Sequence, residues 1–302
     1  MINRTPRPRT IIGHYELFGF LGRGGSANVY LARHVHLRTW HAIKILKTPL
    51  AQKGRHKFLE EARLVASLDN EHIVRVQDFG VYNGNPYLVM SYAPHGSLRA
   101  FHPRGSLLPF DTILTYLEHI AEALNYLHEQ DLIHLDIKLE NLLLGHNNEV
   151  LLGDFGITEA AHGTSGSRSG TFTHMAPEHL RGNPGAASDQ YALAVCVYEW
   201  LTGQLPFIGT RTEVKWKHLH EQPGSLRALA PDIPLAMERV VLRALSKNPQ
   251  RRYPSVGAFV DAFREAMPPA LPRASALSTV KVSLLKLRRW VANCRKWLLT
   301  RL

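Results

Sequence analysis

The predicted secondary structure of this chain changes in kind near residue 95. Residues 15–92 contain short segments that are rich in β-branched and aromatic residues and are separated by glycine, asparagine or proline, which is the pattern of β-strands. Residues 53–69 are the exception, because their apolar side chains recur at helical spacing, at Phe58, Ala62, Val65 and Leu68. This part is therefore predicted to be a small antiparallel sheet with one helix.

From about residue 97 the periodicity is helical. The segment 111–130 carries a continuous apolar stripe, and Asp111 is placed to cap its N-terminus. Further helices are predicted at 188–203, 233–246 and 255–267. The sequence thus predicts an α+β protein with two lobes, in which a small strand-rich lobe precedes a larger, mainly helical one.

The composition is that of an ordinary globular domain. The 302 residues are 45% hydrophobic and 20% charged, and no apolar run approaches the roughly 18–20 residues that a membrane-spanning helix needs. Cys196 and Cys294, the two cysteines, are far apart and predict neither a disulfide framework nor a zinc cluster. The first ten residues lack the apolar core of a secretory signal. We therefore expect a cytoplasmic protein.

The net charge of +11 is concentrated at the two ends of the chain. Residues 1–14 contribute +3 and residues 273–302 contribute +8, and neither segment contains an acidic residue, so the intervening residues sum to zero. A folded domain that binds nucleic acid gathers its basic residues on one face. Here the charge lies in two appendages, and no nucleic-acid partner is expected.

The tail alternates apolar and basic residues, and its apolar stripe is flanked by Trp290 and Trp297. Such a basic amphipathic helix binds an anionic membrane surface or docks on a partner; the alternatives are a helix packed on its own domain and a frayed terminus. The chain is thus predicted to consist of a basic extension (1–14), a domain (15–267, with lobes at about 15–92 and 97–267), a linker rich in proline, alanine and serine (268–278) and the tail (279–302).

Polar and apolar residues alternate in HLDIKLEN (134–141), which precedes two short apolar strands separated by the turn HNNE. Asp136 and Asn141 are expected on the loop that enters this hairpin, and Asp154 on the loop that leaves it. Carboxylate and amide oxygens are ligands that Mg²⁺ prefers, usually together with a phosphate-bearing substrate. We interpret the apolar residues as anchors of a loop whose polar groups project into a cleft.

Two features of the strand-rich part suit the same kind of substrate. LGRGGSANV (21–29) is a glycine-rich turn whose backbone N–H groups can approach phosphate oxygens closely, although ordinary hairpin turns use glycine too. Lys44 lies within an apolar strand, where a lysine needs an anionic partner. Glu61 falls on the inward stripe of the following helix and is the predicted partner, whereas Glu60 is expected to face water.

In their order along residues 15–267, these motifs resemble the eukaryotic-type (Hanks-type) protein kinase family in a bacterial-like form. HAIKIL resembles the family's VAIK strand, HLDIKLEN resembles HRDLKPEN, and DFG is present unaltered. GTFTHMAPE resembles the end of the activation segment, and RRYPSV resembles a late motif in which Arg252 would pair with Glu178. The resemblance implies the bilobal kinase fold and an ATP- and Mg²⁺-dependent protein kinase.

The resemblance also implies a role for individual residues. Asp136 would orient the substrate hydroxyl and accept its proton, and Lys138 would neutralise the transferring phosphoryl group. Asn141 and Asp154 would hold Mg²⁺, and Lys138 is typical of members that act on protein serine and threonine. The residues implied in ATP binding are Leu21, Gly22, Gly24, Val29, Ala42, Lys44, Glu61, Met90, Tyr92 and Leu143. Structural or regulatory roles are implied for Leu135, Thr171, Glu178, Asp189 and Arg252.

The chain departs from the family pattern at three positions. Ala27 replaces the third glycine of the phosphate loop and Leu139 replaces a proline, and both are minor changes. Leu135 replaces the arginine that in the family binds an activation-loop phosphate, which makes the catalytic loop non-RD. Because leucine cannot bind a phosphate, we expect little dependence of activity on phosphorylation of that loop.

Two other functions fit some of the same motifs. A pseudokinase would use the fold as a nucleotide-binding or scaffold module, with Leu135 and Ala27 as marks of relaxed catalytic demands. A small-molecule phosphotransferase is disfavoured by the APE segment and the helix around Asp189, which build the protein-substrate platform in protein kinases. His218 and His220 are predicted to be solvated surface residues rather than metal ligands.

Overall fold

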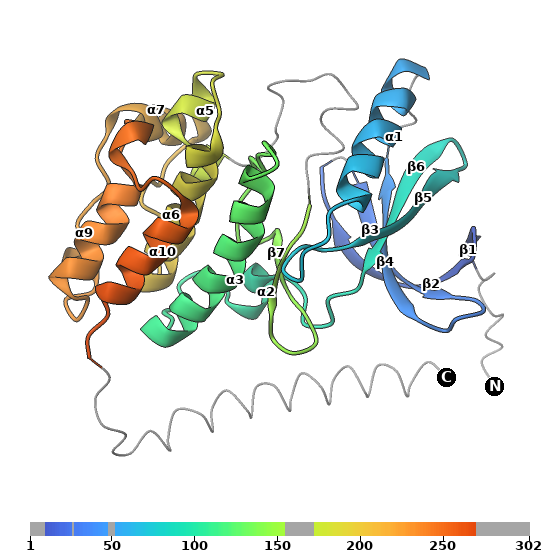
Figure 1. Cartoon of the computed structure of the whole chain (residues 1–302), viewed down its shortest axis with the longest axis horizontal. Helices are drawn as coiled ribbons and strands as arrows, with labels where there is room; N and C mark the ends of the chain where they lie inside the picture. Colours follow the sequence, from blue (N-terminus) through green and yellow to red (C-terminus); the bar gives the residue numbers. More distant parts are fainter. Residues whose placement is uncertain (1–9, 26, 48–51, 155–171, 270–302) are drawn as a thin grey trace, which may run out of the picture. The chain divides into compact units, whose positions relative to one another are not determined.

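The computed structural model describes residues 10–25, 27–47, 52–154 and 172–269 (Figure 1). The chain divides into two units, 1–267 and 268–302, and all described residues except 268 and 269 belong to the first. The predicted amphipathic tail, 279–302, lies outside the described residues. Within the described part, no helix is long and apolar enough to cross a membrane.

The strand-rich part forms one antiparallel sheet (Figure 1). Its strand order is β1-β2-β3-β4-β6-β5, so only the step from β4 to β6 skips a strand in the chain. The strands are β1 (Ile11–Ile12), β2 (Tyr15–Arg23), β3 (Ala27–His34), β4 (Trp40–Leu46), β5 (Val76–Tyr82) and β6 (Asn85–Ser91).

Helix α1 (Gln52–Ala66) covers one face of this sheet. Phe58 of α1 is buried in the same apolar cluster as Leu46 and Leu88 of the sheet. Because side chains alternate along a strand, Lys44 lies on the same face of β4 as Leu46, two residues further on. Lys44 therefore lies on the face of the sheet that α1 covers.

The second part of the domain is built around one buried helix, α6 (Ala186–Thr202). Every residue of α6 from Ser188 onward is buried, which is typical of a helix that is surrounded by others. Helices α3 (Phe110–His128), α9 (Leu235–Ala244) and α10 (Val256–Glu265) pack against it. The shorter elements are α2 (Leu98–Phe101), η1 (Phe172–His174), α5 (Pro177–Leu180), α7 (Arg211–His220), α8 (Leu226–Leu229) and η2 (Pro249–Arg251).

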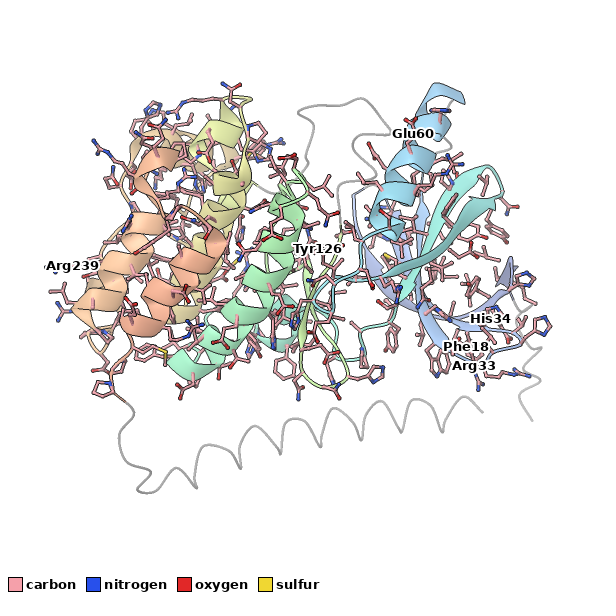
Figure 2. The ribbon with its side chains drawn as sticks, viewed as in Figure 1. Phe18, Arg33, His34, Glu60, Tyr126 and Arg239 are labelled. Atoms are coloured by element: carbon pink, nitrogen blue, oxygen red, sulfur yellow. The ribbon has the colours of Figure 1, made fainter. Side chains whose placement is uncertain are left out.

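A small hairpin of β7 (Leu142–Leu144) and β8 (Val150–Leu152) joins the two parts. The loop after α1 pairs with β8, since the N–H of Leu152 donates to the carbonyl of His72 at 2.7 Å. Three residues before His72, the N–H of Asp69 donates a hydrogen bond to the hydroxyl of Tyr126, which lies on α3 between the two parts (Figure 2). Hydrogen bonds of its backbone groups thus hold the loop after α1 to the hairpin and to α3.

The predicted fold class, a small antiparallel sheet with one helix followed by a larger helical lobe, is confirmed. The predicted cap of α3 is wrong. The helix begins at Phe110, its N-cap is Pro109, and no side chain caps it; Asp111 lies inside the first turn, where its charge still suits the positive end of the helix dipole.

Candidate active site

The polar residues of HLDIKLEN converge on one carboxylate. Asp136 Oδ2 accepts a hydrogen bond from Lys138 Nζ at 2.7 Å and another from Asn141 Nδ2 at 2.9 Å. Asn141 Nδ2 also donates to the backbone carbonyl of Asp136 at 2.8 Å. The side chains of Asp136 and Lys138 are only 18% and 17% exposed, so the loop holds its charges in a fixed, largely dehydrated arrangement.

Lys44 reaches from the sheet to the loop that follows β8. Its ammonium group donates to Asp154 Oδ1 and forms an ion pair with it. The lysine side chain is 9% exposed, so this pair answers the need for an anionic partner, while the Asp154 side chain remains 47% exposed. One ion pair thus connects the two lobes at the site.

The two candidate glutamates of α1 point in different directions. Glu60 is exposed and lies close to His56, with 3.4 Å between their side-chain atoms (Figure 2). Glu61 is half-buried, as its place on the inward stripe predicts. The partner of Lys44 that the structure shows is Asp154; the pairing of Lys44 with Glu61 stays a prediction.

The glycine-rich turn joins β2 to β3. Gly22 pairs with Val29 across the two strands, and the N–H of Gly24 donates to the carbonyl of Ala27 at 2.9 Å. Leu21 is 44% exposed on β2, where it is free to cover a ligand. The backbone conformation at this turn leaves room for a ligand, since a side chain at Gly22 would meet nothing within 4 Å.

Behind this turn, Lys44 and Asp154 line one small pocket together with Met90. The apolar side chains of Val65, Val74, Val76 and Leu88 complete its lining. The remaining residues implied in ATP binding are Ala42, which pairs with Met90 across β4 and β6, Tyr92, which follows β6, and Leu143, which lies on β7.

The loop 134–141, which the resemblance implies is the catalytic loop, is held by a buried carboxylate, that of Asp189 on α6. Its side chain is fully buried and accepts hydrogen bonds from the backbone N–H of His134 (2.9 Å) and of Leu135 (2.8 Å), and its Oδ2 lies 2.9 Å from His128 Nε2. Leu135 has φ +65°, a left-handed conformation that costs a residue with a Cβ about 1–2 kcal/mol. Asp189 therefore holds the loop in a turn that its sequence does not favour.

His134 links this loop to the residue before Asp154. Burial lowers its pKa, so the ring is neutral at pH 7. Its Nε2 lies 3.0 Å from the carbonyl of Gly153, which can only accept, so Nε2 carries the proton. Nδ1 then accepts from the N–H of Asp136 at 3.3 Å. The neutral imidazole thereby fixes the spacing between the loops of Asp136 and Asp154.

The sequence pattern of the protein kinase domain matches residues 15–262, most of the chain. The chain belongs to the protein kinase domain family. It is 33% identical over 253 residues to the serine/threonine-protein kinase PrkC of Bacillus subtilis, covering 81% of this chain and 39% of PrkC. It is 36% identical over 261 residues to PknB of Mycolicibacterium smegmatis (82% and 42%) and 33% identical over 272 residues to PknJ of Mycobacterium tuberculosis (85% and 46%). The chain therefore spans less than half the length of these relatives.

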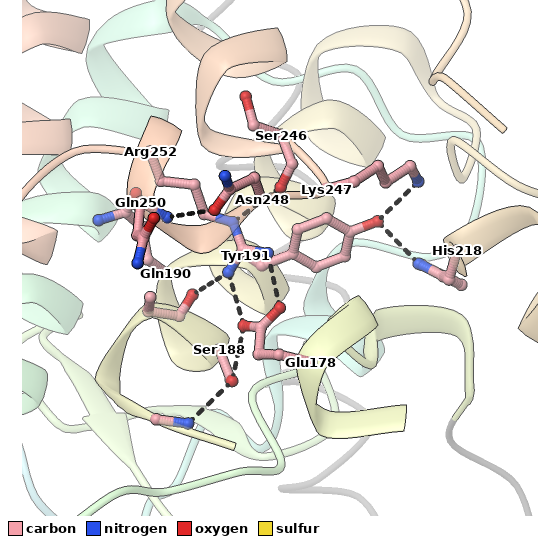
Figure 3. Close-up of polar contacts among 12 residues, drawn as sticks. Glu178, Ser188, Gln190, Tyr191, His218, Ser246, Lys247, Asn248, Gln250 and Arg252 are labelled. Atoms are coloured by element: carbon pink, nitrogen blue, oxygen red, sulfur yellow. Dashed lines mark hydrogen bonds and ion pairs between the residues drawn. The ribbon is translucent and has the colours of Figure 1, made fainter. Parts of the chain in front are cut away.

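A further buried ion pair, between Arg252 and Glu178, lies beside the N-terminal turn of α6 (Figure 3). Arg252 donates from both terminal nitrogens to the carboxylate of Glu178, at 2.7 and 2.8 Å, and Ser188 Oγ donates to the same carboxylate at 2.8 Å. Burial alone would raise the pKa of Glu178, but the hydrogen bonds from Arg252 outweigh it and lower the pKa. The pair that the late arginine motif predicts is thus present.

His218 belongs to the same network, and the prediction that it is a surface residue is wrong. Its side chain is fully buried, with Nδ1 2.9 Å from the hydroxyl of Tyr191 and Nε2 3.1 Å from the carbonyl of Thr173 (Figure 3). Burial lowers the pKa of His218 to about 3. The neutral ring therefore donates from Nε2 to Thr173, in the 3₁₀ turn η1, and accepts from Tyr191. One available signal was the position of His218 four residues after the buried Val214 on α7.

Sequence reasoning also missed Arg99. Its guanidinium donates to Glu199 of α6 at 2.6 and 2.8 Å and to Glu140 of the catalytic loop at 3.1 Å. Its backbone N–H donates to the carbonyl of Leu139 at 3.0 Å. Arg99 thus fastens the C-terminal end of the catalytic loop to α6. Its partner lies 100 residues away, and no local pattern announces it. Thr171, the other predicted residue, lies outside the described residues.

We predict that Asp189→Asn disrupts the catalytic loop. Three donors converge on two carboxylate oxygens, and an asparagine would turn an NH₂ group toward at least one backbone N–H. The free energy of unfolding, measured by urea denaturation, should fall by about 2–4 kcal/mol. The exposed Asp232→Asn is the control and should change it by less than about 0.5 kcal/mol. Equal effects of the two substitutions would contradict the assigned role of Asp189.

Proposed function

We propose that this chain is an ATP- and Mg²⁺-dependent protein kinase that phosphorylates serine and threonine residues of proteins. The observation that carries the proposal is that the ion pair of Lys44 and Asp154 lies beside the cluster of Asp136, Lys138 and Asn141. The two are joined where the N–H of Gly153 donates to the carbonyl of Asn141 at 2.9 Å. PrkC, PknB and PknJ, which the chain resembles over more than four fifths of its length, are named serine/threonine-protein kinases.

The nucleotide would lie between the glycine-rich turn and the residues below it. Backbone N–H groups of the glycine-rich turn would approach phosphate oxygens, and Lys44 adds a cation fixed by Asp154. Met90 and Leu143 supply apolar surface for the adenine ring, and Tyr92 follows at the strand end. Each of these assignments rests on the kinase resemblance together with the position of the residue.

Two of the described residues suit Mg²⁺. Asn141 uses Nδ2 for both hydrogen bonds to Asp136, so its Oδ1 is the atom left to bind a cation. Asp154 pairs through Oδ1 with Lys44, and its side chain is about half exposed at 47%. Oxygen ligands of this kind are those that Mg²⁺ prefers. When bound with ATP, the ion would neutralise charge on the phosphates.

Asp136 and Lys138 are assigned to the transfer itself. The Asp136 carboxylate is held in place by Asn141 and Lys138, and it would orient the substrate hydroxyl and accept its proton. Lys138 lies 2.7 Å from that carboxylate, close enough to stabilise the negative charge of the transferring phosphoryl group. Such catalysis consists mostly of positioning and charge stabilisation, for which these groups suffice.

Incubation of the purified protein and casein with Mg·ATP, read as intact mass, tests the function. We expect mass gains of one or more phosphates on either protein, and none with Asp154→Asn, because that variant loses a carboxylate that serves both Lys44 and the metal. Asp261→Asn on α10 is the matched control and should behave as the unmodified protein. Binding of ATP without any phosphate transfer would favour the pseudokinase alternative.

The proposal includes weak dependence on activation-loop phosphorylation. Leu135 stands at the position before Asp136, its backbone is held by Asp189, and it lines a small pocket with His174 and Met175. A leucine side chain offers a phosphate no hydrogen bond and no charge. The turn of the catalytic loop therefore rests on Asp189, without a phosphate bridge to Leu135.

Simultaneous replacement of Thr164, Ser165, Ser167 and Ser169 by alanine tests this point. These residues lie outside the described residues, in the segment that the resemblance assigns to the activation loop. We expect the variant to keep at least about half of the casein phosphorylation rate, a loss of no more than about 0.4 kcal/mol in transition-state stabilisation. A fall of tenfold or more in the initial rate would show that the activity depends on modification of this loop.

For the basic tail, the proposal is peripheral binding to an anionic membrane surface. Its apolar stripe with flanking tryptophans and its excess of lysine and arginine suit the headgroup region. We expect the full chain to sediment with vesicles that contain phosphatidylserine, and residues 1–272 to stay in solution while still phosphorylating casein. A full-length variant with Lys286, Arg288 and Arg289 replaced by glutamine should also lose binding. Equal sedimentation of all three proteins would contradict the proposal.

A further inference from the structure

His72 lies in the loop between α1 and β5, and one nitrogen of its imidazole forms a hydrogen bond with the backbone. The side chain is 6% exposed, and Nδ1 lies 3.1 Å from the carbonyl of Val150 on β8. A carbonyl can only accept a hydrogen bond, so the proton is on Nδ1. In the neutral ring, Nε2 then carries a lone pair that is available to a Lewis acid.

Two carboxylates converge on that lone pair. Glu71 is the preceding residue, and Glu122 comes from α3; one ligand atom from each of Glu71, His72 and Glu122 lies within 4.8 Å of the others. His72 Nε2 is 3.7 Å from Glu122 Oε2. A metal ion or a proton on His72 Nε2 would be attracted by the Glu122 carboxylate at this separation.

The charge balance favours a divalent ion over a proton. Among the described residues, neither Glu71 nor Glu122 forms an ion pair with a lysine or an arginine, so a protonated His72 would offset only one of the two negative charges. A divalent cation offsets both. The neighbouring His119 stacks on His72, with 4.2 Å between the ring centroids.

The ring of His72 is also oriented as in a metal site. A histidine that binds a metal through one nitrogen normally donates its other N–H to a carbonyl or carboxylate, which fixes the tautomer and the ring plane. Val150 does this for His72, and its own N–H donates to His119 Nδ1 at 3.2 Å, which holds the stacked ring in place. The imidazole therefore needs no rearrangement to act as a ligand.

We propose that Glu71, His72 and Glu122 bind Zn²⁺, with water at a fourth position. Imidazole and carboxylate ligands at about 2.0–2.2 Å suit this ion, and a tetrahedral site places them about 3.3–3.5 Å apart. Glu122 is 55% exposed at its side chain, so it can swing the short distance that the site requires. The three residues are separate from Asn141 and Asp154, which are assigned to Mg²⁺.

A metal at this position would cross-link the loop between α1 and β5 to α3. The carbonyl of His72 accepts a hydrogen bond from the N–H of Leu152, which lies two residues before Asp154. The ion would therefore stiffen the connection on which the position of Asp154 depends. Because a ligand that binds only the folded state stabilises it, bound Zn²⁺ should raise the melting temperature.

The test is isothermal titration of the full, untagged chain with ZnCl₂ in metal-free buffer without nucleotide. We expect one ion bound per chain and a rise in Tm of about 5 °C when zinc exceeds the Kd a hundredfold. Glu122→Gln, at a half-exposed side chain, should lose at least about tenfold in affinity and most of the Tm rise. Glu60→Gln is the matched control, since it removes the carboxylate of an exposed histidine–glutamate pair, and it should bind as the unmodified chain does.

Absence of zinc binding, or binding of equal stoichiometry and affinity in Glu122→Gln, would overturn the proposal. His72 and Glu122 would then share a proton rather than a metal. His72→Asn serves as a second variant with the same expected loss of binding. Since it also removes the bond to Val150, its melting temperature without zinc is measured first, and the comparison with Glu122→Gln decides the assignment if His72→Asn does not fold.

Discussion

The buried carboxylate of Asp189 is the interaction on which the arrangement of the catalytic loop depends. It accepts hydrogen bonds from two consecutive backbone N–H groups, those of His134 and Leu135, and thereby stabilises a left-handed leucine that would otherwise be disfavoured. Because α6 is buried along most of its length, Asp189 has no freedom to move away. The position of Asp136 is therefore determined by the packing of α6 in the core of the helical lobe.

The contacts that hold the sheet lobe against the loop of Asp136 are weaker and more exposed to solvent. Lys44 and Asp154 form an ion pair across the site, and the Asp154 side chain is 47% exposed, so solvent and ligand can reach it. Behind it, the loop after α1 is bonded to β8 and to α3 through backbone groups. The helical lobe thus supplies a fixed base, and the strand-rich lobe is attached to it at a few points close to Lys44 and Asp154.

The fold class and most of the site could be predicted from the sequence, because the relevant signals are local. Alternating strands, helical stripes and the polar spacing of HLDIKLEN all lie within short segments, and resemblance to kinases added the long-range pair of Glu178 and Arg252. What could not be predicted depends on tertiary contacts. His218 is buried on α7 where it lies against Tyr191 of α6, and the ion pair of Lys44 with Asp154 joins residues 110 positions apart in the chain.

The buried charges of the helical lobe are better explained by specificity than by stability. Removing a carboxylate and an arginine from water costs several kcal/mol per ion, and a well-packed apolar pair would often be as stable. Arg252 nevertheless also donates to the backbone carbonyls of Ser246 and Ala187, and Arg99 also donates to the side chain of Glu140. Apolar replacements could fill the same volume but could not select one orientation of these segments. A kinase domain needs its few charged groups held within a fraction of an ångström, and directional charged hydrogen bonds provide that selection.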